Sequence, residues 1–88
     1  MNKDRRKELA ALASRVQEIA ELIESLKGDL ENVRDEEQDY FDNMPENMQD
    51  GDRGTRAQDA ISELEDALSA LDDFDADTIT GSLDTAAE

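Results

Sequence analysis

Carboxylates are the only side chains in this sequence numerous enough to suggest chemistry. The 88 residues contain 25 Asp and Glu, 9 Lys and Arg, and no His or Cys, for a formal net charge of −16. Without imidazole or thiol, the chain lacks the usual general base, the usual activated nucleophile and the soft ligands of a structural zinc site. Paired carboxylates need a partly dry pocket to act as acid and base, and so short a chain has little material for one. We therefore expect no catalytic residues and no enzyme activity.

One segment begins like a calcium-binding loop but lacks two of its ligands. If Asp50 and Gly51 take positions 5 and 6 of that loop, Met48 falls at position 3 and Ala57 at position 12, where oxygen ligands belong. We expect no metal site and no cofactor.

Apolar side chains recur along the first half of the chain with the period of a coiled coil. Their spacing alternates between three and four residues, which places them on one face of a helix. The set consists of Leu9, Leu12, Val16, Ile19, Ile23, Leu26, Leu30 and Val33. Ala13, Ala20 and Leu22 widen the face to that of a bundle helix. The pattern predicts a helix over residues 4–42, roughly 55 Å long at about 1.5 Å per residue.

A shorter helix is expected after a loop at 43–54. Pro45 disfavours helical geometry in the residue before it, and two of the four glycines follow it closely. Thr55 and Gln58 match a capping box. A second apolar row comes after them, formed by Ala57, Ile61, Leu64, Leu68 and Leu71. These signals predict a second helix over 56–72.

The predicted fold is all-α, with a helical hairpin over 1–74 and a flexible acidic tail over 75–88. The second helix is too short to cover the first, which leaves an apolar patch with no partner in the chain. This patch, the expected dimer interface, consists of Leu9, Leu12, Val16, Ile19, Leu22 and Ile23. An antiparallel four-helix bundle of two chains would cover it and bring the basic residues 3–7 near the partner's acidic residues 35–39. A monomer whose tail folds over the patch, or a patch that binds another protein, remain alternatives.

The negative charge is concentrated in one part of the chain. Residues 1–28 contain five acids and six bases, whereas residues 29–88 contain 20 acids and three bases. Over residues 29–46 the carboxylates recur every ~3.4 Å of helix axis, which is the phosphate spacing along one strand of B-DNA. Charge runs usually only keep a protein soluble. The concentration of charge favours a second interpretation, in which the carboxylates bind a basic surface.

Two aromatic residues lie among these carboxylates. Tyr40 and Phe41 suit either a core plug at the end of the hairpin or a contact with a partner. The candidate partner-binding set is Asp35, Glu36, Asp39, Tyr40, Phe41, Asp42 and Glu46.

The basic cluster at residues 3–7 lacks aromatics, so we expect no direct nucleic-acid binding. No uncharged run approaches the length of a membrane span and no signal-peptide core is found, so we expect a cytoplasmic protein that binds no membrane.

The stretch RDEEQDYFDNMPENMQ at 34–49, followed by RGTRAQDAISELEDALSAL at 53–71, resembles a group of short acidic helical proteins encoded by bacteriophages and prophages. The specific part is the YFDNMPEN run and the RG-x-x-A after it. The resemblance implies a viral origin and action in the cytoplasm of a bacterial host. With the charge pattern, it favours a DNA-mimic inhibitor of a host defence or nucleic-acid-processing protein, of the anti-restriction or anti-CRISPR type. The alternative is a structural or adaptor coiled coil that binds a partner helix through the Leu9 to Ile23 patch.

Overall fold

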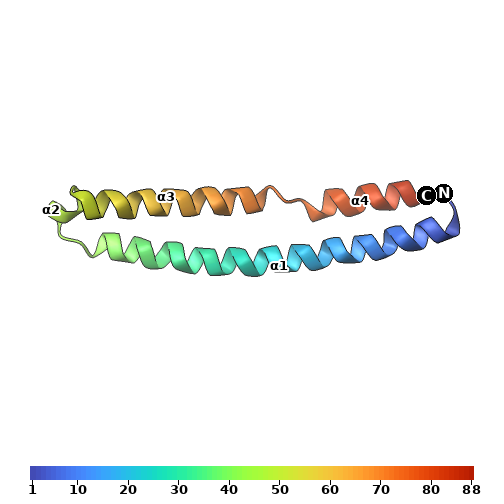
Figure 1. Ribbon diagram of the computed structural model, residues 1–88, viewed down its shortest axis with the longest axis horizontal. Helices are drawn as coiled ribbons and strands as arrows, with labels where there is room; N and C mark the ends of the chain where they lie inside the picture. Colours follow the sequence, from blue (N-terminus) through green and yellow to red (C-terminus); the bar gives the residue numbers. More distant parts are fainter. The chain divides into compact units, whose positions relative to one another are not determined.

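The computed structural model describes all 88 residues, and every regular element in it is a helix. The elements are α1 (Lys3–Asp42), α2 (Glu46–Gln49), α3 (Asp52–Asp72) and α4 (Ala76–Ala87) (Figure 1). The chain forms two compact units. Leu26–Asp72 make up the hairpin unit, and Met1–Ser25 with Asp73–Glu88 make up the terminal unit. The predicted all-α fold class is confirmed.

The hairpin unit folds because apolar faces of two helices pack side by side. In this unit α3 runs back along the C-terminal part of α1 (Figure 1). Its buried apolar residues are Met44, Ala57, Ile61 and Leu68. An ion pair between Lys27 and Asp72 joins the two helices at the end away from the turn. The predicted helical hairpin is therefore present in this unit.

The segment expected to be a loop, 43–54, is mostly helical. Its single proline begins a helix, because the fixed φ of proline suits a helix N-terminus. The Pro45 carbonyl accepts hydrogen bonds from the backbone N–H groups of Met48 and Gln49, at 2.9 and 3.0 Å. The next helix, α3, already begins at Asp52. The predicted loop is thus too long.

The capping box expected at Thr55 and Gln58 is also wrong, because both residues lie inside α3. The tight corner between α2 and α3 depends instead on Gly54, which is buried. A Cβ atom at this position would overlap the backbone of Gln49. Gly54 therefore lets the two helices approach each other at backbone distance.

The terminal unit contains a helix where a flexible tail was expected. Asp75 caps α4, because its carboxylate accepts hydrogen bonds from the backbone N–H of Thr78 at 3.0 Å and from the Thr78 hydroxyl at 2.6 Å. Ala76, Thr80, Leu83 and Ala87 form the half-buried face of this helix, which lies beside the N-terminal part of α1 (Figure 1). The expectation of a flexible tail over 75–88 is therefore corrected. The capping pair and the spacing of small residues were the signals for this helix.

We predict opposite effects for two glycine-to-alanine substitutions in helices of the hairpin unit. Gly54→Ala should lower the free energy of unfolding by roughly 1–3 kcal/mol, because the added methyl group collides with backbone at Gln49. Gly28→Ala, the control, meets nothing within 4 Å and should raise it by about 0.5–1 kcal/mol through better helix propensity. Urea denaturation followed by circular dichroism measures both. Equal stabilisation by the two variants would contradict the close approach of α2 and α3.

We also predict that α4 loosens in acid. Hydrogen bonds from the Thr78 hydroxyl and amide hold the pKa of Asp75 below its ordinary value. A carboxylate with a lowered pKa in the folded state stabilises that state above its unfolded pKa, and the contribution is lost as the pH falls through the folded pKa. Carbon chemical shifts of residues 76–87, followed by NMR from neutral pH into acid, should show this loss.

Asp75→Asn should flatten this acid transition, because its single amide oxygen can still accept the hydrogen bond from the Thr78 backbone N–H and does not titrate. Asp84→Asn, which neutralises an exposed acid of the same helix outside the cap, is the control and should leave the transition in place. An unchanged transition in Asp75→Asn would count against the cap as its cause.

Candidate partner-binding surface

Exposed carboxylates dominate the surface of the hairpin unit. Leu26–Asp72 contain 15 acids and four bases. In this unit Asp72 forms an ion pair with Lys27, and Asp35 forms one with Arg34 at 3.0 Å. The helices thus hold many carboxylates in water without a cation beside them.

The predicted carboxylates on α1 are all exposed, but they do not share one face. Asp35, Asp39 and Asp42 lie at positions i, i+4 and i+7, on the side of α1 that faces solvent. The Gln38 amide donates a hydrogen bond to the carboxylate of Asp42, at 3.0 Å. Glu36 is turned by about 100° from Asp35, because helical neighbours differ by that angle. Glu46, also exposed, begins α2.

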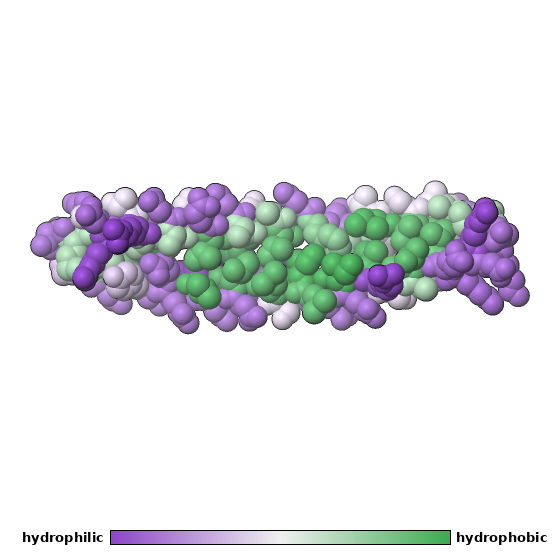
Figure 2. Space-filling model, viewed as in Figure 1, coloured by the Kyte–Doolittle hydropathy of each residue, from purple (hydrophilic) through white to green (hydrophobic).

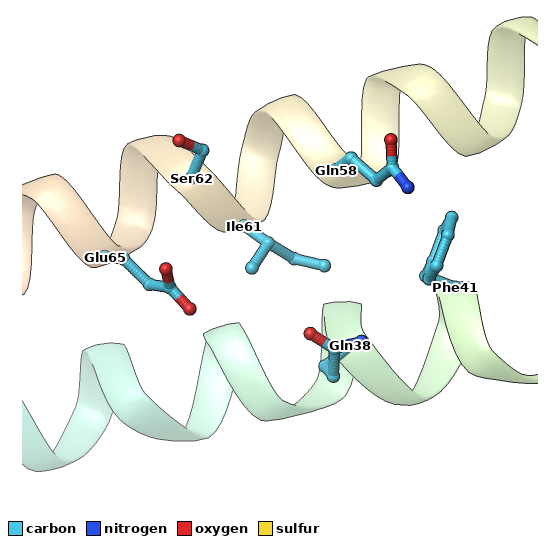
Figure 3. Close-up of a pocket in the computed structure, with 6 residues that line it drawn as sticks. All are labelled: Gln38, Phe41, Gln58, Ile61, Ser62 and Glu65. Carbon is cyan, nitrogen blue, oxygen red and sulfur yellow. The ribbon is translucent and has the colours of Figure 1, made fainter.

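The structure separates the two adjacent aromatic residues. The side chain of Tyr40 is half exposed. The side chain of Phe41 is more buried and points toward α3, where Ile61 lies across from it (Figure 3). Its carbonyl accepts a hydrogen bond from the side chain of Gln49 at 3.1 Å. Phe41 is therefore part of the hairpin packing, whereas Tyr40 belongs to the exposed surface.

A hollow of about 260 Å³ lies between α1 and α3 in the hairpin unit. It is lined by Gln38, Phe41, Gln58, Ile61, Ser62 and Glu65 (Figure 3). An aromatic ring and an aliphatic side chain form its apolar part, and amide, hydroxyl and carboxylate oxygens supply acceptors. This combination suits the flat, cationic guanidinium group of an arginine, which binds carboxylates and stacks on aromatic rings. Sequence reasoning missed the hollow, because its lining comes from two helices that only the fold brings together.

The predicted dimer-interface residues divide into two groups. Leu9, Val16 and Ile23 are half-buried. They belong to the terminal unit, in which residues 73–88 form a compact group with residues 1–25. The expectation that the patch has no partner within the chain is therefore wrong for these three residues. The other three remain exposed, with Leu22 at 71%. They are Leu12, Ile19 and Leu22.

Comparison of the chain with protein-family models, with curated proteins and with solved structures finds no match. No helix combines the length and the apolar character needed to cross a bilayer.

Proposed function

We propose that this chain is a non-catalytic, phage-encoded inhibitor that covers a basic, nucleic-acid-binding surface of a bacterial host protein. The target class would include restriction enzymes, CRISPR effectors, other defence nucleases and nucleic-acid-processing proteins. The observation that carries the proposal is the array of exposed carboxylates on the helices of the hairpin unit, most of which have no cation beside them. Its site of action would be the cytoplasm of the host.

The rigidity of the helices supports this proposal. Asp35, Asp39 and Asp42 repel one another across single helical turns, at a cost of a few tenths of a kcal/mol for each pair. A basic partner relieves this repulsion on binding. Because the helix holds these groups in place beforehand, little backbone ordering is needed to present them.

The hollow beside Phe41 supplies a specific contact for the proposed partner. An arginine side chain from the partner would pair with the carboxylate of Glu65 at one end of the hollow, and a second cationic side chain would stack on the Phe41 ring at the other end (Figure 3). Arginines that bind phosphates are well suited to such a site, because guanidinium groups pair with carboxylates and phosphates in similar geometry.

The proposed mechanism is competition with nucleic acid. Carboxylates would occupy positions that phosphates take in the complex of the host protein with DNA or RNA. Association between oppositely charged surfaces is accelerated by long-range attraction and weakens as salt screens the charges. Binding would thus be fast, sensitive to salt and exclusive with nucleic acid.

The test uses the full chain, immobilised and exposed to host proteins that also bind DNA-cellulose. We expect capture of basic proteins that duplex DNA and added salt both release. The triple variant Asp35→Asn, Asp39→Asn, Asp42→Asn should lose at least about tenfold in affinity, since each lost charge contact contributes on the order of 0.5–1 kcal/mol. A matched control, Glu8→Gln, Glu18→Gln, Glu21→Gln, removes the same charge from the terminal unit and should change affinity far less.

Two outcomes would contradict mimicry. Capture that persists in high salt and in excess DNA would show that phosphate replacement is not the mechanism. Capture lost on polar substitution of Leu12 and Ile19, but kept in the acidic triple variant, would favour the adaptor alternative instead.

A further inference from the structure

Five of the six exposed large apolar side chains of α1, all except Leu22, follow an uninterrupted seven-residue repeat. We name this set the heptad row, and it consists of Leu12, Ile19, Leu26, Val33 and Tyr40. Each is between 42% and 50% exposed. Because α1 is one continuous helix of 40 residues, a repeat of seven keeps all five side chains on one stripe of its surface.

Packing within the chain uses a neighbouring stripe of α1. Leu9, Val16, Ile23 and Leu30, each three residues before a member of the heptad row, are half-buried. The heptad row is therefore the second half of a coiled-coil face whose first half is already occupied. In known coiled coils both halves contribute side chains to the core.

The hairpin unit is apolar on one side of its buried row and polar on the other. On α3, Ala60, Leu64, Ala67 and Leu71 lie at i, i+4, i+7 and i+11, beside the buried Ile61 and Leu68. Gln58, Ser62 and Glu65 lie on the other side of that row and line the hollow. Figure 2 shows apolar side chains gathered between α1 and α3 on one face of this unit. This face is where another helical surface would pack.

We propose that the heptad row binds a second copy of the chain in antiparallel orientation. In one register Leu12 meets Tyr40 of the partner subunit, Ile19 meets the partner's Val33, and Leu26 meets the partner's Leu26. All five layers are then filled on both chains, as a self-complementary two-fold interface requires. The register differs from a pairing over the Leu9 to Ile23 patch, because half of that patch packs within the chain.

The charges beside the heptad row favour this orientation. Arg15 follows Leu12 by three residues, and Glu36 follows Val33 by three residues, so both flank the row on the same side. The antiparallel register places Arg15 beside the partner's Glu36, and symmetry provides this pair twice. A parallel, in-register dimer would instead place the two copies of Arg15 on opposite sides of the row, and likewise the two copies of Glu36, so this ion pair would not form.

Cysteine crosslinking tests the interface directly, because the chain contains no cysteine. Leu26→Cys should form a covalent dimer under mild oxidation, since the partner's residue 26 lies opposite. Ile19→Cys and Val33→Cys, unfolded together and refolded, should crosslink to each other at least fivefold more than either does to itself. Asn32→Cys, an exposed position off the heptad row, is the control and should crosslink only at background level. Preferential self-crosslinking of Ile19→Cys would overturn the antiparallel orientation.

Charge reversal provides a second test that does not disturb the core. Arg15→Glu and Glu36→Arg should each raise the dimer dissociation constant several-fold, and the double variant should restore it, as measured by sedimentation or light scattering over a wide range of concentration. If the unmodified chain has the mass of one molecule at every concentration, the proposal is overturned. That holds even if the heptad row binds a different protein. The test is separate from that of the proposed function, because dimer mass is measured without a host protein.

Discussion

The hairpin depends on how closely α3 approaches its neighbours. Gly54 allows backbone contact with α2, and Ala57, Ile61 and Leu68 form a narrow buried row along α3. Few large side chains are buried in this unit, so its hydrophobic stabilisation is small for its length. Most of the other side chains are exposed, and they include both carboxylates and large apolar groups.

The two sides of the hairpin unit suit different partners because of helical geometry. A helix that buries one row of side chains must present the positions on either side of it to solvent. Here one side carries the heptad row, and the other carries polar groups around the hollow at Phe41. The proposed dimerisation through the first would leave the second open. The proposed self-association and the proposed capture of a basic partner are therefore compatible with each other.

The differences between expectation and structure have local physical causes. The sequence predicts that the first helix ends before Pro45, and α1 does end at Asp42. The fixed φ of proline also starts a helix, however, and α2 begins directly after Pro45. The acidic segment after Asp75 was expected to be flexible because it lacks a long apolar period. Its helix depends on a capping pair and on small residues that pack beside α1. Such short-range signals are weaker in a sequence than a repeat of eight apolar residues.

The sequence by itself determined the helical class, the length of α1 and the concentration of acid, because periodicity and charge are properties of residue order. It also separated apolar from charged positions on each helix. Only the tertiary structure decided which half of the apolar face of α1 packs within the chain and that Phe41 turns inward while Tyr40 stays exposed. Those outcomes depend on which helix lies alongside and on the angle at which side chains meet, and neither is encoded in the spacing of one helix alone.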